Sequence, residues 1–392
     1  MKKTMQLYIH IPFCVKKCAY CDFLSFAADE QTQAMYVKAL QKELEFYGRK
    51  YGDWAISTIF IGGGTPSWLD EKAMAAVFDT VYKHFEVLPD AEISIECNPG
   101  TVTDAKFLAY KNAGINRLSI GLQSANNEEL QFLGRIHTFE QFLKTYDKAR
   151  HHGFSNINVD LMSSLPGQTK ETFVASLKKV IRLKPEHISA YSLIIEEGTP
   201  FYENYRTDVE KQEAGEPTEF LPSEEEVYET TKLTRELLQA EGYHWYEISN
   251  FAKPGKECRH NIGYWKRADY LGVGLGAASL LDNVRYANTS DLRKYLCWME
   301  QNVVLPGELV TGEVLSRAAQ MEEFMFLGLR MVDGFKRKEF LDAFGIEIEG
   351  VYGDVLHSLQ KEELIQMQEG RIALTDKGID VSNYALAQFL LS

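Results

Sequence analysis

Hydrophobic and polar positions in the first half of the chain follow two alternating periods. Short apolar runs rich in β-branched residues predict six strands: Leu7–Ile11, Ile56–Ile61, Glu92–Glu96, Arg117–Leu122, Asn156–Met162 and His187–Leu193. Between them, apolar residues recur at helical spacing in Gln33–Tyr47, Glu71–His84, Asp104–Lys111, Phe139–His152 and Lys170–Ile181. This alternation predicts parallel strands joined by crossover helices. Six such units favour an α/β fold, a partial (β/α)6 barrel, over a closed eightfold barrel.

The pattern changes after the sixth predicted strand. From Glu203 to Glu226 the chain is acidic and rich in turn-forming residues, which predicts a solvated loop. A helix over Glu224–Glu241 and a strand over His244–Ile248 follow. We then expect a loop over Ser249–Tyr264, and a glycine-rich segment over Leu271–Ala278 that completes the barrel wall.

After Gly312 the pattern becomes helical, with one short strand pair near Leu364–Leu374. This predicts a small, mostly helical, winged-helix-like C-terminal domain. We therefore expect two domains, residues 1–310 and 311–392. The second carries 8 basic and 14 acidic residues, a net charge of −6, whereas a DNA-reading wing would be basic.

The whole chain is acidic, with 42 basic and 56 acidic residues among 392 and a net charge of −14. This charge repels phosphate backbones and anionic membrane surfaces, so nucleic acid is not the expected partner. No segment approaches the roughly 20 apolar residues that cross a bilayer. Met1–Gln6 is short and polar, unlike a secretory signal, and we therefore expect a cytoplasmic protein.

Three of the six cysteines, Cys14, Cys18 and Cys21, lie together in the predicted loop after the first strand. In a reducing compartment such a group indicates metal binding rather than disulfides. Each thiolate can ligate one iron of a 4Fe-4S cluster, which leaves the fourth iron open. A structural zinc ion is the alternative, but it requires a fourth Cys or His, and none lies between Asp22 and Gln33.

The spacing C-x3-C-x2-C, with Tyr20 directly before the last cysteine, resembles the signature of the radical S-adenosylmethionine (SAM) superfamily. The stretch from Leu7 to Cys14, which includes Tyr8, narrows the resemblance to the oxygen-independent coproporphyrinogen III oxidases and their relatives, the HemW-type haem chaperones. The likeness covers nearly the whole chain. It implies a radical SAM barrel that holds a 4Fe-4S cluster and SAM, with Tyr8 and Tyr20 beside these cofactors.

The segment Gly62-Gly63-Gly64-Thr65-Pro66 follows the second predicted strand and is similar to the family's GGGTP motif. Glycines there let the backbone approach a ligand that a Cβ would exclude. The resemblance implies that Gly63, Gly64 and Thr65 lie beside the methionyl amino group of SAM. From the residues alone, a tight strand-to-helix turn remains the alternative.

Polar residues also occur on the next three predicted strands, at Glu96, Gln123 and Asp160, and we expect them at one level around a shared pocket. The resemblance implies that they hold the amino-acid and ribose parts of SAM. It also implies that Arg135 pairs with the SAM carboxylate, although a surface helix charge is the alternative for this residue. The chain departs from the family at Ser164, where relatives carry glycine before Leu-Pro.

Two features separate haem delivery from porphyrinogen decarboxylation. The decarboxylases carry a further cysteine two residues after the trio, where this chain has Phe23, and a longer segment before the first strand. In addition, the segment from His260 to Trp265 resembles the HNxxYW motif of the HemW-type haem chaperones. The resemblance implies that His260 is an axial haem ligand and that Trp265 stacks on the porphyrin. A histidine and two aromatic residues of the barrel wall are the alternative.

The sequence thus supports two functions of different classes. The first is a haem chaperone that carries a cluster and SAM and delivers haem to acceptor haemoproteins, with a reductant protein such as flavodoxin or ferredoxin as a further partner. The second is an oxygen-independent coproporphyrinogen III oxidase, a radical SAM decarboxylase. We favour the first and identify no catalytic residue.

Overall fold

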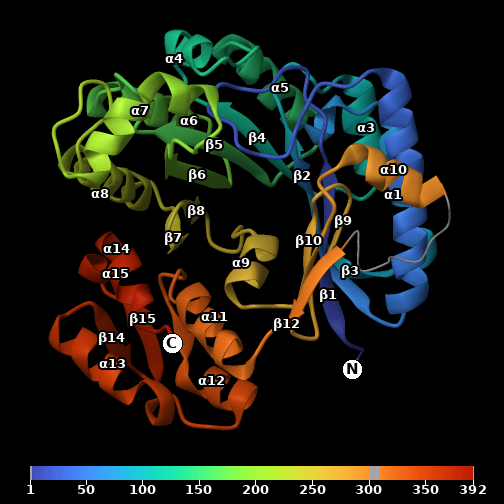
Figure 1. Cartoon of the computed structure of the whole chain (residues 1–392). Helices are drawn as coiled ribbons and strands as arrows, with labels where there is room; N and C mark the ends of the chain where they lie inside the picture. The colour runs from blue at the N-terminus through green and yellow to red at the C-terminus, as the bar shows by residue number, and fades with distance from the viewer. Residues whose placement is uncertain (1, 301–309, 392) are drawn as a thin grey trace.

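The computed structural model describes residues 2–300 and 310–391, and its main feature is a curved 12-stranded sheet (Figure 1). Six parallel strands, β1 to β6, lie side by side in chain order at its centre. These strands are β1 (Thr4–Ile11), β2 (Ala55–Gly63), β3 (Glu86–Cys97), β4 (Arg117–Gln123), β5 (Ile157–Ser163) and β6 (His187–Ser192). The predicted partial (β/α)6 barrel is confirmed.

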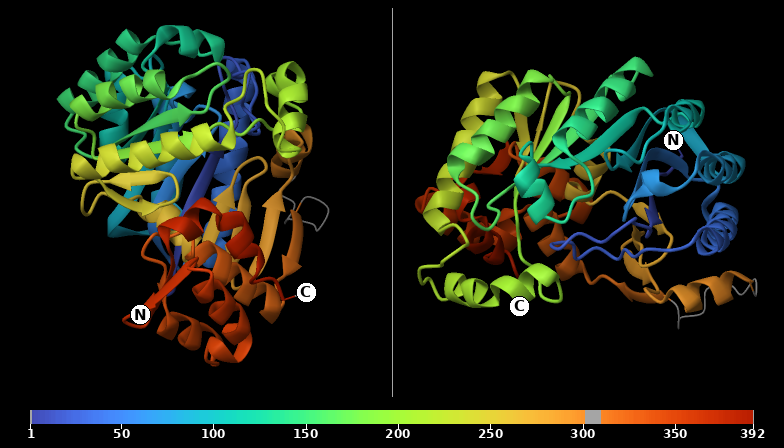
Figure 2. Two further views of the ribbon diagram at one scale, coloured as in Figure 1. Left: turned by 90° about the vertical axis from the view of Figure 1, so that its left-hand side faces the viewer. Right: turned by 90° about the horizontal axis from the view of Figure 1, so that it is seen from above.

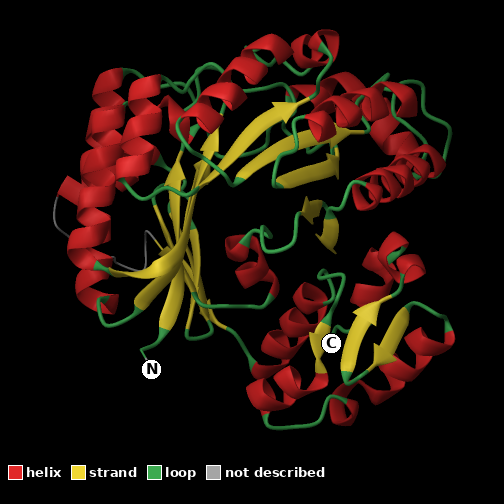
Figure 3. Ribbon diagram, turned by 180° about the vertical axis from the view of Figure 1, so that it is seen from behind, coloured by secondary structure: helices red, strands yellow, loops and turns green. Residues whose placement is uncertain are grey.

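Helices on the convex side of this sheet connect the strands, and the concave side stays open (Figures 1 and 3). Most of them begin at a Ser, Thr, Asp or Asn whose side chain accepts a hydrogen bond from the first turn. The helix starts predicted at Glu71, Asp104, Phe139 and Lys170 are confirmed, whereas the first helix begins three residues before the predicted Gln33 and a short helix over Asn127–Phe132 was not predicted. The helices are α1 (Glu30–Tyr51), α2 (Glu71–His84), α3 (Asp104–Asn112), α4 (Asn127–Phe132), α5 (Phe139–His151) and α6 (Lys170–Arg182), with a 3-10 turn over Pro66–Trp68.

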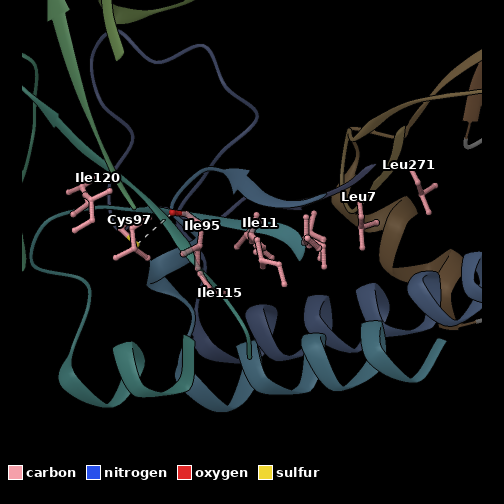
Figure 4. Packing of buried hydrophobic residues seen from close by; sticks show 14 of the residues in the cluster. Leu7, Ile11, Ile95, Cys97, Ile115, Ile120 and Leu271 are labelled. Carbon is pink, nitrogen blue, oxygen red and sulfur yellow. Dashed lines mark hydrogen bonds between the residues drawn. The ribbon is translucent and has the colours of Figure 1, made fainter. Parts of the chain in front are cut away.

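The core between the sheet and these helices consists of aliphatic side chains from alternate strand positions. Figure 4 shows Leu7 and Ile11 of β1 in line with Ile95 of β3 and Ile120 of β4. Cys97, which is 3% exposed, lies among these side chains at the end of β3. This cysteine is therefore a small core residue, and it lies apart from the cysteine trio.

Further strands extend the sheet at both edges, and most of their pairings are antiparallel. β9 (Tyr270–Val273) pairs in parallel with β1, and β10 (Ala278–Leu281), β11 (Val284–Asn288) and β12 (Val310–Val314) follow it. β8 (Asn250–Ala252) and β7 (His244–Glu247) follow β6 at the opposite edge. The glycine-rich segment thus extends the barrel wall beside the first strand, and α10 (Leu292–Glu300) lies next to α1.

The solvated loop predicted over Glu203–Glu226 is wrong for its first half. Helix α7 (Pro200–Glu213) occupies this part, and α8 (Glu224–Ala240) begins at its end. Thr199 caps α7, and Asp208 accepts hydrogen bonds from the backbone of Glu219, Phe220 and Leu221. The acidic composition therefore reflects exposed helix faces and an exposed turn, which the buried Asp208 holds in place through these local hydrogen bonds.

The loop predicted over Ser249–Tyr264 is also wrong in part. Strand β8 lies near its start, and the short helix α9 (Arg259–Trp265) contains the whole HNxxYW segment. Helical spacing places residues four apart on the same face of α9. This arrangement determines which side chains of the motif reach the concave side of the sheet.

The C-terminal unit lies below the open side of the barrel, and Figure 2 shows it as a separate mass of short helices. Its three-stranded sheet has the order β13-β15-β14, and Phe335 and Phe340 lie in its core. Its elements are α11 (Arg317–Gly328), β13 (Phe335–Lys336), α12 (Arg337–Phe344), α13 (Glu349–Lys361), β14 (Ile365–Gln368), β15 (Arg371–Leu374), α14 (Asp376–Asp380) and α15 (Ser382–Ala387). The predicted start of this unit at residue 311 stays a prediction. Residue 311 falls within β12, and residues 301–309, directly before this strand, lie outside the described part.

Helices with the length and apolarity needed to span a bilayer do not occur within residues 2–300 or 310–391.

Ser164, the residue at the family's glycine position, has a φ of 62°. This left-handed conformation costs an L-residue about 1–2 kcal/mol, and glycine recovers it at an entropic cost of about 0.5–1 kcal/mol. We expect Ser164→Gly to stabilise the protein by about 0.5 kcal/mol, seen as a higher urea midpoint. The matched Ser163→Gly change, in the extended end of β5, should instead lower the midpoint, and a lower midpoint for Ser164→Gly would contradict this account.

Candidate functional site

One cavity of about 680 Å³ is lined by residues of the central strands and of the loops that follow them. The predicted site residues that line it come from the loop after β1, the end of β2 and the turn after it, β3, β4, the segment after α4, β5 and α9. They are Cys14, Cys18, Tyr20, Cys21, Gly63, Gly64, Thr65, Glu96, Gln123, Arg135, Asp160 and Trp265. The structure does not place Tyr8 and His260 in this lining.

The cysteine trio lies in the loop between β1 and α1, which backbone hydrogen bonds hold against the barrel. Cys14 N donates to Phe26 O at 3.0 Å, and Phe26 N donates to Pro12 O at 2.9 Å, so the two ends of the loop are tied together. Cys14 is nearly buried, whereas Cys18 and Cys21 are half-buried. All three thiols are free, and burial raises the pKa of Cys21.

The surroundings of the trio fit a polynuclear cluster. Within the described ranges, no three Cys, His, Asp or Glu side chains converge on a single metal ion. Thiolates that each bind a different iron of a cuboidal cluster do not need to converge on one point. A Cβ on Gly64 would lie 3.0 Å from Cys14 Sγ and 2.9 Å from Phe13 O, so a side chain there would fill the space beside this thiol.

The glycine run brings the backbone of β2 against buried polar groups. Gly63 has a φ of +117°, and a Cβ there would lie 2.5 Å from the ring of His10. Its amide donates to Glu96 Oε2 at 3.0 Å. Thr65 Oγ1 lies 3.4 Å from Cys14 Sγ. The glycine run is therefore more than a tight turn, because it contacts Cys14 on one side and Glu96 on the other.

Glu96 is a carboxyl group without a cation next to it. Burial, together with the nearby Asp160 carboxylate, raises its pKa to about 8. No described Lys or Arg lies within ion-pair distance of it. A carboxylate in this setting gains most from a ligand that brings a positive charge or a hydrogen-bond donor.

This raised pKa predicts a pH-dependent stability. The unfolded pKa is near 4.5 and the folded pKa is about 8, so the contribution of Glu96 to stability is lost as the pH rises between these values. We expect Glu96→Gln, which keeps an acceptor for Gly63, to stabilise the SAM-free protein on the order of 1–3 kcal/mol at pH 8.5 and little at pH 5. Thermal unfolding at the two pH values measures this difference. An equal effect at both pH values would contradict the raised pKa.

Arg135 follows α4 and points to the trio, so it is not a surface helix charge. Its Nη2 donates to Asn98 Oδ1 at 2.6 Å and to Gly121 O at 2.9 Å, and its Nη1 lies 3.6 Å from Cys18 Sγ. Its Nε is buried without a hydrogen-bond partner in the described part of the chain. The Arg135 guanidinium is thus fixed by its Nη2 hydrogen bonds, and its Nε–H remains available to a ligand.

Glu96, Gln123 and Asp160 line the same cavity but not at one level of the sheet. Glu96 pairs in register with Ser119, whereas Asp160 pairs with Gly121, two residues further along β4. The expected common level is therefore wrong, because neighbouring strands of a barrel are staggered. Gln123, with a φ of 73°, accepts a hydrogen bond from Tyr191 at 2.9 Å. Asp160 accepts hydrogen bonds from Asn158 and Ser119, and burial raises its pKa.

The two predicted tyrosines differ in position. Tyr20 lines the cavity beside Arg135, and burial raises its pKa. Tyr8 lies on β1, where its hydroxyl is 3.0 Å from Nδ1 of His10 and its ring stacks on Phe60. A direct cofactor contact of Tyr8 has no support in this geometry.

Helix α9 presents two different faces. Asn261 and Trp265, four residues apart, line the cavity. His260 and Tyr264, also four residues apart, face the sheet, where Tyr264 makes an edge contact with Tyr270. The HNxxYW motif thus contributes one aromatic residue to the cavity and one to the wall.

His260 does not have the position predicted for an axial ligand. It is 0% exposed and stacks on Phe60, with Nδ1 2.7 Å from Thr58 Oγ1 and Nε2 3.0 Å from the Tyr264 hydroxyl. Burial, with the nearby Arg117, lowers its pKa to about 3. Both ring nitrogens are therefore occupied, which matches the barrel-wall alternative.

Several cavity residues were missed by the sequence reasoning. Asn98, directly after β3, bridges Thr65 and Arg135, and a polar residue following a parallel strand could have indicated it. Arg117 lies at the opposite, amino end of β4, where we expected no site residue. Arg330 comes from the C-terminal unit, and no local sequence signal connects it to the barrel.

Comparison with known proteins agrees with this geometry. Residues 8–180 match the radical SAM superfamily, and residues 315–381 match the HemN C-terminal domain. The haem chaperone HemW of Lactococcus lactis is 34% identical over 391 residues, covering 100% of this chain and 98% of that relative. The chain belongs to the HemW family, within the radical SAM superfamily.

Other HemW proteins give the same result. The haem chaperone HemW of Bacillus subtilis is 35% identical, covering 98% of both chains, and that of Escherichia coli is 41% identical over 70% of this chain and 69% of its own length. Among solved structures, coproporphyrinogen III oxidase (HemN) of E. coli has a TM-score of 0.83 at 24% identity, covering 100% of this chain and 91% of that chain. This likeness shows a shared fold.

Proposed function

We propose that the protein is a haem chaperone that holds a 4Fe-4S cluster and SAM in the barrel cavity and passes haem to acceptor haemoproteins. The observation that carries this proposal is the end-to-end match to haem chaperones named HemW, together with a motif helix whose Asn261 and Trp265 line the cavity of the cysteine trio. Phe23 lies in the same lining, at the position where the decarboxylases carry a further cysteine.

The proposed roles follow the cavity walls. Cys14, Cys18 and Cys21 would hold the cluster, which in its reduced form supplies an electron to the SAM sulfonium. Gly63, Gly64, Thr65 and Glu96 would bind the methionyl amino group, and the free Nε of Arg135 would bind the carboxylate. Gln123 and Asp160 would contact the ribose side, and Tyr20 would close the cavity beside Arg135.

For haem, the geometry supports Trp265 as a contact and His260 as a positioning residue. Trp265 offers a half-buried indole ring to the cavity, and its Nε1 has no partner among the residues described. An axial bond from His260 Nε2 would require Tyr264 to release that nitrogen. In the observed conformation, His260 instead ties α9 to β2 through Thr58.

The remaining partners belong to the same proposal. Lys16 and Lys17 are exposed beside the cysteine trio and would complement an acidic reductant such as flavodoxin or ferredoxin. A cytoplasmic location is in keeping with three free thiols at the site.

A transfer assay tests the proposal. Haem-loaded protein is mixed anaerobically with increasing concentrations of apomyoglobin, and the change of the Soret band is followed. Direct delivery should give a rate that rises with acceptor concentration, whereas passive release gives a constant rate. A constant rate, or turnover of coproporphyrinogen III to protoporphyrinogen by the reconstituted protein with SAM and reductant, would contradict the chaperone function.

A further inference from the structure

The part of the cavity away from the cysteine trio contains buried hydrogen-bond donors without partners. Arg117 Nε, Trp265 Nε1 and Arg330 Nε are all buried and donate to no acceptor among the described residues. All three side chains line the same cavity. A buried donor left unpaired is costly and uncommon in native proteins, so three at one cavity indicate a ligand that supplies acceptors.

Arg117 is the most unusual of the three. It is 2% exposed, and its guanidinium makes no hydrogen bond or ion pair with any residue in the described ranges. Glu92 and Asp160 act on it only at longer range. Glu92 already accepts hydrogen bonds from the amides of Arg259 and His260, and Asp160 accepts them from Asn158 and Ser119. A buried arginine normally forms an ion pair with a carboxylate, and within residues 2–300 and 310–391 no carboxylate does so with Arg117.

The C-terminal unit supplies the second guanidinium. Arg330 follows α11, and its guanidinium lies 4.5 Å from the centre of the Trp265 ring. Val332 N donates to Tyr246 O at 3.1 Å, which fixes this segment to the edge of the barrel sheet. Glu247 lies nearby but accepts a hydrogen bond from the Ser249 amide and forms no ion pair with Arg330. The unit thus closes the cavity with a cation rather than an apolar surface.

This region is distinct from the thiol end of the cavity. Arg117 begins β4 and Gln123 ends it, and at about 3.3 Å per residue the two lie roughly 20 Å apart along the strand. Arg135 and the cysteines lie at the Gln123 end. A carboxylate that chelates the cluster iron must lie at that end, so it cannot also reach Arg117.

We infer that Arg117, Trp265 and Arg330 form a subsite for a carboxylate group and that, if the proposed function holds, this carboxylate is a porphyrin propionate. Guanidinium groups bind carboxylates through paired N–H donors, and the indole N–H adds a third. The stacked Trp265–Arg330 pair offers a flat surface for the macrocycle next to these donors. The lining of the cavity also includes Asn250, whose Oδ1 is a buried acceptor without a partner among the described residues.

Binding of iron protoporphyrin and of its dimethyl ester tests this inference, because the ester lacks the free carboxylates. The wild-type protein should bind the free acid at least about tenfold more tightly than the ester. Arg330→Gln, at a half-exposed position, should remove most of this preference, and so should Arg117→Gln if its thermal unfolding shows a folded protein. Arg206→Gln, on the exposed face of α7, should keep it. Equal affinity for both porphyrins in the wild-type protein, or an unchanged preference in Arg330→Gln, would overturn the inference.

Two further measurements separate the possible outcomes. SAM affinity of the cluster-reconstituted Arg330→Gln protein should be unchanged, and a loss of SAM affinity with porphyrin preference retained would assign the subsite to the SAM carboxylate and overturn the inference. A protein that discriminates acid from ester but releases haem passively would contradict the chaperone function alone. Acceptor-dependent transfer without discrimination would contradict the subsite alone, and no porphyrin binding at all would contradict both.

Discussion

Replacing any one of Cys14, Cys18 or Cys21 by alanine is expected to abolish the broad visible absorbance of the anaerobically reconstituted protein. In the proposed site three thiolates would hold a cluster whose fourth iron has no protein ligand, so the loss of one would leave two protein bonds. Cys14 is tied to the barrel through its backbone and lies against Gly64, and Cys97, which also lines the cavity, comes from β3 rather than from the loop of the trio. Iron and sulfide analysis should fall from about four of each per chain to less than one.

Two other cysteines provide matched controls for this experiment. Cys97 is buried at the end of β3, outside the loop of the trio, and Cys297 is exposed on α10. Cys97→Ala and Cys297→Ala should keep the full absorbance and iron content. A trio variant with a full complement of iron and sulfide would show that the cluster does not depend on these thiols.

The barrel and the cysteine end of the cavity were predictable because their signals are local. Each strand from β1 to β6, and each helix between them except α4, was predicted from its own hydrophobic period, and cap residues such as Thr103 and Thr138 mark where helices begin. The glycine run and the cysteine trio lie within single loops. Parallel connectivity then brings these loops to one end of the sheet without further information.

The other end of the cavity could not be predicted, because it depends on contacts between distant segments. Arg330 reaches the barrel only because the C-terminal unit docks on β7, and Arg117 lies at the end of a strand where barrels do not usually carry chemistry. The acidic segment after Glu203 misled for a related reason. Its composition indicated a loop, whereas Asp208 satisfies three backbone amides and folds the segment back on α7.

His260→Ala is expected to destabilise the protein by about 2–5 kcal/mol. The change removes a fully buried ring that stacks on Phe60 and leaves the hydroxyls of Thr58 and Tyr264 without partners. Trp265→Ala removes a half-buried ring from the cavity and should instead weaken haem binding by about 1–3 kcal/mol, with a smaller effect on stability. Urea unfolding and haem titration of both variants separate the two effects.

Loss of haem from an unstable His260→Ala protein would not by itself show whether His260 is a haem ligand or a positioning residue. The Tyr264→Phe variant distinguishes these two roles. This change removes only the hydroxyl that occupies His260 Nε2, at a cost of about 1 kcal/mol for one hydrogen bond. If His260 positions α9, the Soret band should keep its wild-type position and haem affinity should change little. If His260 is the axial ligand, freeing Nε2 should tighten haem binding or shift the band, because the nitrogen no longer has to exchange one partner for another. The hydrogen bonds to Thr58 and Tyr264 lead us to expect an unchanged band.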